Sequence, residues 1–149
     1  MRFRQPAVFS RLAPYGPTVL RIAMGIVFIA HGMQKIDNGM AGVAGFFGSL
    51  NIPMPEVMAW VITALEVGGG VLLLLGLGTR IVALLFAIQM VFTIALVRAE
   101  LGLVAQQGTG AEIDLMLLAA GLALAFTGPG AAAVDRMIGL EPKESPIHA

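Results

Sequence analysis

Residues 55–98 decide the fold, and they read PEVMAWVITALEVGGGVLLLLGLGTRIVALLFAIQMVFTIALVR. Two apolar stretches make up this segment, residues 55–77 and 80–98, and only Gly78 and Thr79 separate them. A bilayer core about 30 Å thick is crossed by about 20 helical residues, so each stretch is long enough to span it. A connection this short places consecutive helices side by side in opposite directions. The segment therefore predicts a tight antiparallel hairpin of two membrane helices.

Two further apolar stretches flank this hairpin, residues 17–36 before it and residues 111–127 after it. Neither alternates apolar and polar residues as the wall of a membrane barrel must. Pro17 and Pro55 suit the first turn of a helix, where a missing N–H is tolerated, and Pro129 ends the last stretch. We therefore expect an all-α fold, an integral membrane four-helix bundle forming a single domain over residues 15–139.

The composition favours the same class. Of the 149 residues 58% are hydrophobic and 12% are charged, against about 25% charged in ordinary soluble domains. Nine basic and nine acidic residues give a formal net charge of zero, so there is no basic excess for binding nucleic acid. The absence of Cys excludes disulfides and thiolate metal sites, and the two His residues do not have the spacing of a metal motif. No haem-attachment or nucleotide-binding motif occurs either.

The basic residues outside the spans or at their ends predict the orientation. Lys35 and Arg98 fall on one side of the membrane, and six basic residues fall on the side of the termini. These six are Arg2, Arg4, Arg11, Arg80, Arg136 and Lys143. Because basic residues accumulate on the cytoplasmic side, both termini are expected there. Residues 1–14 would be a basic cytoplasmic N-terminus, and the polar residues 140–149 a flexible cytoplasmic tail.

Residues 39–51 connect the first two spans and are too short and too rich in glycine to cross the membrane. Phe46, Phe47 and Leu50 would lie within about one helical turn of each other, which suits a short segment in the outer interface. An apolar loop packed on the rim of the bundle explains the same pattern equally well.

Glu66 is the strongest candidate for a functional residue, because it lies near the middle of the second span. A carboxylate at this depth should be protonated or paired with a cation. Arg21, His31 and Lys35 of the first span are the candidate partners. The sequence leaves open whether Glu66 serves a ligand or a proton, or is only a structural clamp between helices.

The other polar candidates in the spans each have a structural alternative. His31 could relay protons, since its unperturbed pKa is about 6.5, or could be a hydrogen-bonded packing residue. Arg21 could extend to the cytoplasmic headgroups or act inside the bundle. Gln89 is expected to hydrogen-bond between helices. Of the acidic pair in the fourth span, Glu112 is expected to face the bundle and Asp114 to lie nearer the headgroups.

Glycines inside the spans are expected to let helix backbones approach closely. The candidates for such helix packing are Gly25, Gly32, Gly69 and Gly70.

Over residues 17–139 the order of these features resembles the DoxX family of small bacterial membrane proteins. The matching landmarks are Arg21, residues 31–35 (HGMQK), 45–53 (GFFGSLNIP), 66–70 (EVGGG), 76–80 (GLGTR), 110–112 (GAE), 128–130 (GPG) and Asp135. Two positions depart from the family pattern. Arg98 stands where a His commonly ends the third span, and Ala133-Val134 stand where Ser-Leu usually precede the Asp.

The resemblance implies a multi-pass protein of the bacterial inner membrane and suggests a membrane subunit of a redox or quinone-related system. A polar pocket formed by Arg21, His31, Lys35, Glu66 and Glu112 would then hold a quinone. Its partners would be the lipid bilayer, other redox subunits and further copies of the chain in a homo-oligomer. Any catalysis would depend on those other subunits. A carrier of a lipid-like or small polar molecule is the first alternative. A structural or assembly partner without catalysis is the second.

Overall fold

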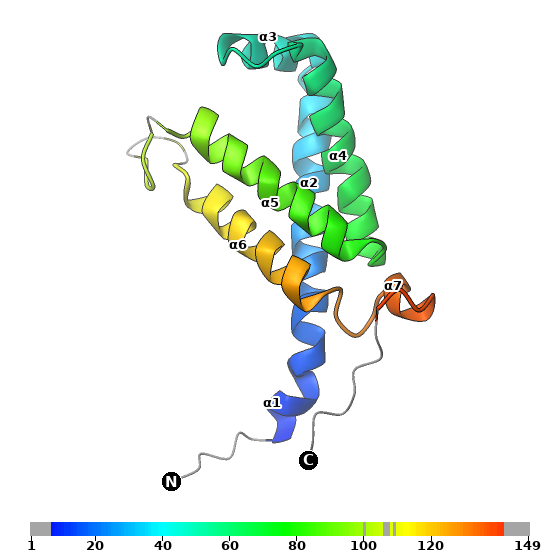
Figure 1. Ribbon diagram of the computed structural model, residues 1–149. Helices are drawn as coiled ribbons and strands as arrows, with labels where there is room; N and C mark the ends of the chain where they lie inside the picture. The colour runs from blue at the N-terminus through cyan, green and yellow to red at the C-terminus, as the bar shows by residue number, and fades with distance from the viewer. Residues whose placement is uncertain (1–6, 100, 106–107, 109, 142–149) are drawn as a thin grey trace.

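A computed structural model describes residues 7–99, 101–105, 108 and 110–141 of the chain (Figure 1). The described residues form helices and connecting turns and contain no strand. The helices are α1 (Ala7–Leu12), the short 3-10 helix η1 (Ala13–Tyr15), α2 (Gly16–Asp37), α3 (Met40–Ser49), α4 (Pro55–Leu75), α5 (Thr79–Leu96), α6 (Glu112–Thr127) and α7 (Val134–Met137). The predicted basic residues Arg2 and Arg4 and most of the predicted tail lie outside the described residues.

Three helical runs are long and apolar enough to cross a membrane: residues 8–37, 55–75 and 79–96. The bounds of the second and third runs lie close to the predicted spans, whereas the first run begins at residue 8 and not at residue 17 because α1 and η1 continue into α2. The fourth predicted span corresponds to α6, which has 16 residues. At about 1.5 Å per residue α6 is ~24 Å long, shorter than a hydrocarbon core of about 30 Å. The chain is thus all-helical, with three long apolar helices and a shorter fourth.

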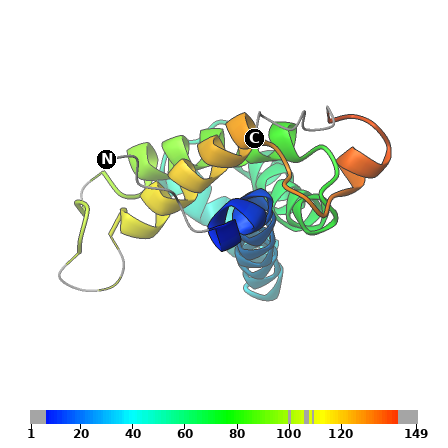
Figure 2. The same cartoon turned by 90° about the horizontal axis from the view of Figure 1, so that it is seen from below.

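The long helices form two pairs. α2 packs along α4, α5 packs along α6, and the second pair lies across the first (Figure 1). Figure 2 looks nearly along α2 and shows α5 and α6 side by side, lying across its axis. The core sits where the pairs cross. It contains Met24, Phe28, Leu73, Val82, Ala83, Phe86, Met90 and Leu124.

Glycines bring the helix backbones together at the contacts between these helices. A Cβ atom on Gly70 of α4 would lie 2.6 Å from Cγ1 of Ile29 and 2.8 Å from the carbonyl oxygen of Gly25 on α2. A Cβ atom on Gly69 would lie 2.9 Å from the ring of Phe86 on α5. Such separations leave no room for a side chain, so these glycines set the distances between the helices.

The segment between the first two spans is helical, as α3. Ala44 of α3 is buried, and the hydroxyl of Thr63 on α4 lies 3.9 Å from the sulfur of Met40. Phe46 remains 48% exposed. α3 therefore packs against α4 with one side and leaves an aromatic side chain open on the other.

Candidate functional site

Glu66 lies in a buried cluster of three polar side chains from three helices. Nζ of Lys35 on α2 lies 2.5 Å from Oε2 of Glu66 on α4. Nε2 of Gln89 on α5 donates a hydrogen bond of 2.6 Å to Oε1 of the same carboxylate. Glu66 is only 3% exposed, so both oxygens of a buried carboxylate are satisfied by side chains. This polar cluster, Lys35–Glu66–Gln89, links the α2–α4 pair to α5.

The local sequence explains why Lys35 reaches Glu66. Lys35 is in the last turn of α2, and helix side chains lean toward the N-terminus of their helix, here toward the middle of the bundle. A Cβ atom on Gly32, one turn earlier, would lie 3.1 Å from Cβ of Glu66. The absence of a side chain at Gly32 therefore lets α4 approach α2 at the level where the two charges meet.

The cluster keeps two unused features. Gln89 is only 9% exposed, and its Oε1 is buried without a hydrogen-bond partner. The side chain of Lys35 is 24% exposed, so its ammonium is not sealed inside the bundle. A buried acceptor without a donor is costly unless something occupies it. The arrangement can thus offer a donor, an acceptor and a proton-binding carboxylate to a small polar group.

Arg21 is not part of this cluster. It is 1% exposed, and its guanidinium donates only to backbone carbonyls: to Pro129 O at 3.1 Å, to Leu74 O at 2.9 Å, and to the carbonyls of Leu73 and Ala132. Leu73 and Leu74 belong to the last turn of α4, whose carbonyls have no partner within the helix. Arg21 therefore holds the end of α4 and the loop after α6 against α2, and it does not extend to headgroups.

Asp135 secures the turn between α4 and α5 at the same end of the bundle. Its carboxylate accepts hydrogen bonds from the backbone N–H groups of Gly78 at 2.7 Å and Thr79 at 3.0 Å, and its own N–H donates to Gly76 O. Gly76 and Gly78 both have positive φ, at 71° and 61°, which favours glycine. A Cβ atom on Gly76 would also lie 2.7 Å from the Arg21 guanidinium. Asp135 acts as the helix cap of α5 from a distant part of the chain.

The expectation for the acidic pair of the fourth span was wrong. Asp114 is buried at 8% exposure, and its Oδ2 lies 3.0 Å from Nε of Arg98, whereas Glu112 is only partly buried. Oε2 of Glu112 is turned toward the preceding loop, near Gly110. The ion pair with Arg98 at the end of α5 holds Asp114, and not Glu112, toward the bundle. The sequence held a signal for this pair, because Arg98 and Asp114 border the same loop.

His31 also lies away from Glu66. It is exposed on α2 and, with Val27, Ala30 and Gln34, borders an open groove along one side of that helix. The pocket predicted from Arg21, His31, Lys35, Glu66 and Glu112 is therefore not assembled as one site. The structure brings Lys35 and Glu66 together, adds Gln89, and places the remaining three elsewhere.

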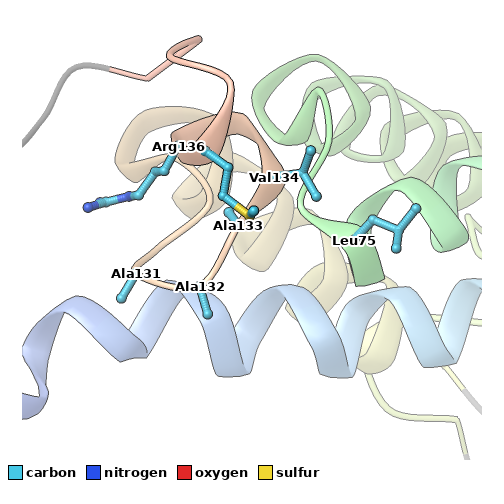
Figure 3. A pocket seen from close by; sticks show the side chains of 7 residues that line it. Leu75, Ala131, Ala132, Ala133, Val134 and Arg136 are labelled. Atoms are coloured by element: carbon cyan, nitrogen blue, oxygen red, sulfur yellow. The ribbon is translucent and has the colours of Figure 1, made fainter.

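A second open hollow lies at the α7 end of the bundle (Figure 3). Leu75, the loop residues 131–133 and Val134 border it, and the guanidinium of Arg136 points away from Leu75. Its lining is mostly small and apolar and includes none of the predicted site residues. We therefore take the Lys35–Glu66–Gln89 cluster as the candidate site.

Comparison with known proteins identifies the family. The sequence model of the DoxX family matches residues 16–99, more than half of the chain, from the start of α2 to just beyond α5. This chain belongs to the DoxX family. Arg21, Lys35, Glu66, Gln89 and Arg98 all lie within the matched region.

Relatives of this DoxX protein match over nearly their whole length. "Putative oxidoreductase CatD" of Bacillus subtilis is 38% identical over 134 residues, covering 90% of this chain and 95% of the relative. "Inner membrane protein YqjF" of Escherichia coli is 33% identical over 132 residues, covering 87% and 96%. "Inner membrane protein YphA" of Escherichia coli is 31% identical over 133 residues, covering 86% and 94%. No solved structure gives a significant match. The chain is therefore a DoxX-family membrane protein.

Proposed function

We propose that this protein is the membrane subunit of a quinone-related redox system and that the Lys35–Glu66–Gln89 cluster binds the quinone headgroup. The observation that carries the proposal is the buried Glu66 carboxylate, paired at 2.5 Å with a partly exposed Lys35 beside the unpartnered Oε1 of Gln89. The name of the relative CatD supports an oxidoreductase context.

The chemistry of a quinone fits these three groups. The Lys35 ammonium can donate to a quinone carbonyl, and Oε1 of Gln89 can accept from a quinol hydroxyl. Glu66 can take or supply the proton that accompanies each electron, because a carboxylate beside a movable lysine can change its protonation state. The electrons would come from a partner subunit with its own cofactor, since this chain has no Cys to hold an iron–sulfur cluster.

We further propose that the protein crosses the bacterial inner membrane four times with both termini in the cytoplasm. Arg11, Arg80 and Arg136 belong to the end of the bundle that carries α1 and α7, whereas Lys35 and Arg98 belong to the opposite end. This asymmetry supports the cytoplasmic assignment of the α1–α7 end. A bilayer that thins locally can accommodate the shorter α6. In this orientation α3 lies in the outer interface.

The orientation can be tested by labelling, because the chain has no Cys and single-Cys variants carry one thiol each. In intact spheroplasts a membrane-impermeant maleimide should label Ser49→Cys at the end of α3 and should not label Met137→Cys on α7. Both should be labelled after the membrane is permeabilised. The opposite pattern in the intact spheroplasts would reverse the orientation.

The proposed function is tested by purifying the protein in mild detergent and extracting its lipids. The wild type should carry a quinone, and Glu66→Gln should lose it. Glu56→Gln, at the exposed first turn of α4, is the matched control and should keep it. Deleting the gene should also change the rate of quinol oxidation by isolated membranes. Absence of quinone together with an unchanged oxidation rate would refute the redox proposal. In that case the cluster would serve as a clamp between helices.

A further inference from the structure

The groove on α2 lies one turn from the candidate site. The four residues that line it, Val27, Ala30, His31 and Gln34, follow a spacing of three and four and so share one face of the helix. We call this surface the α2 groove. His31 and Gln34 are exposed in it, so two polar side chains stand within an otherwise apolar surface.

Lys35 connects the α2 groove to the buried cluster. It follows His31 by four residues, so the two side chains lie on adjacent turns of nearly the same face. Lys35 is also the exposed member of the cluster, at 24% of its side chain, while Glu66 is buried. A molecule that occupies the groove is therefore one helical turn from the ammonium that pairs with Glu66.

The bundle is closed on the other side of the cluster. Toward the α7 end, α2 packs with Met24 and Phe28 in the core, and the ring of Phe28 stacks on Phe86 with centroids 3.6 Å apart. Beyond this layer Arg21 is bonded to the carbonyls around it. Toward the α3 end the α5–α6 pair turns away from α2 (Figure 1). The cluster is thus approached more easily from the side of α2 and from the α3 end.

The geometry points to the α2 groove as the entrance through which a lipid-soluble quinone leaves the bilayer and reaches Lys35 and Glu66, with His31 and Gln34 as its first hydrogen-bonding contacts. This inference rests on the proposed function. Residues 27–34 lie inside an apolar helix long enough to span the membrane, so the molecules that meet the groove come from the bilayer. Imidazole and amide N–H groups can donate to quinone carbonyls, while Val27 and Ala30 offer apolar contact to the ring.

Photolabelling with an azido-ubiquinone, followed by mass spectrometry of the full-length protein, tests this entrance. Label that is competed by decylubiquinone is expected on residues 27–35. Competed label confined to α5 and α6, with quinone binding that still depends on Glu66, would overturn the entrance and leave the proposed function standing. If no label were competed and the protein carried no quinone, both the entrance and the proposed function would be refuted.

Bulky substitutions supply a second measurement. Ala30→Trp should fill the α2 groove without touching Glu66 and should slow decylubiquinone binding several-fold. Ile26→Trp introduces the same indole at a residue of α2 that is 57% exposed and does not line the groove, and this variant should bind decylubiquinone at the wild-type rate. Unfolding midpoints should be compared to confirm that both variants are folded. If folded Ala30→Trp and Ile26→Trp bound decylubiquinone at equal rates, the α2 groove would not be the entrance. In that case His31→Ala should also leave the binding rate unchanged.

Discussion

Two cations on α2, the buried Arg21 and the partly exposed Lys35, have opposite kinds of partners. Arg21 is surrounded by four backbone carbonyls, and its charge is held where two other chain segments meet. Lys35 pairs with one carboxylate side chain and stays partly exposed. Backbone carbonyls cannot change protonation state or move independently of the fold, whereas a lysine and a glutamate can do both. Arg21 therefore stabilises the fold, and the proposed function places the chemistry at Lys35 and Glu66.

Replacing Arg21 is expected to have the largest effect on stability. Arg21→Met removes the guanidinium donor from four carbonyls, of which only Leu73 O keeps a backbone donor among the described residues, the N–H of Gly76, so the free energy of unfolding should fall by about 3 kcal/mol or more. Arg21→Lys should recover only part of this loss, because an ammonium lacks the planar fork that reaches several carbonyls together. Reversible unfolding in mixed detergent micelles measures both. Arg11→Met, at an exposed position of α1, is the control and should be neutral. A wild-type stability for Arg21→Met would remove the structural role.

Gly70 tests whether the packing of α2 on α4 is as tight as the distances indicate. Gly70→Leu must push against Ile29 and the backbone of Gly25, so it should cost about 1–3 kcal/mol. Gly68→Leu on the same helix is the matched control, because a Cβ atom there has no neighbour within 4 Å. The same unfolding assay should separate them. Equal stabilities would mean that the two helices are not in close backbone contact at Gly70.

Asp135 tests the cap that lies beside the Arg21 region. Asp135→Ala leaves the N–H groups of Gly78 and Thr79 without their acceptor and should cost about 1 kcal/mol. Asp37→Ala removes an exposed carboxylate at the end of α2 and should leave stability unchanged. If both variants unfolded at the same point as the wild type, the carboxylate of Asp135 would not be a cap in the folded protein.

Glu66→Gln is expected to have a smaller effect on stability than Arg21→Met and a large effect on ligand binding. The substitution keeps the shape of the side chain, but its amide has one acceptor oxygen for the two donors, Nζ of Lys35 and Nε2 of Gln89, so the cost should be about 1–3 kcal/mol. Quinone affinity should fall by about tenfold or more, because hydrogen bonds that involve a charged group are worth about 1.5–3 kcal/mol. Unfolding and quinone titration of the same preparation give both values. A stability loss as large as that of Arg21→Met would instead mean that Glu66, like Arg21, mainly stabilises the fold.

The helices could be predicted from the sequence because length, apolarity and proline positions fix them locally. The partner of Glu66 could not be chosen among Arg21, His31 and Lys35, since the choice depends on the register of α2 against α4 and on the close contact at Gly32. The prediction for Glu112 and Asp114 failed for a similar reason. The rotation of α6 about its axis is set by the pairing of Asp114 with Arg98, just after α5. This pairing cannot be predicted from the sequence around either residue alone.

The cap by Asp135 shows the same limit over a longer distance. Asp135 lies in the short helix α7, after α6, and nothing in its immediate neighbours indicates that it binds the turn at Gly78 and Thr79. The family resemblance pointed to the residue without giving its role. Only the folded chain brings the two segments together.

The amount of quinone bound to the purified protein, measured for the wild type and for Glu66→Gln in folded preparations, tests the proposed site most directly. We predict quinone in the wild type, little in Glu66→Gln, and the wild-type amount in Glu56→Gln. Equal amounts in the wild type and Glu66→Gln, or none in either, would contradict the assignment of the Lys35–Glu66–Gln89 cluster as the functional site.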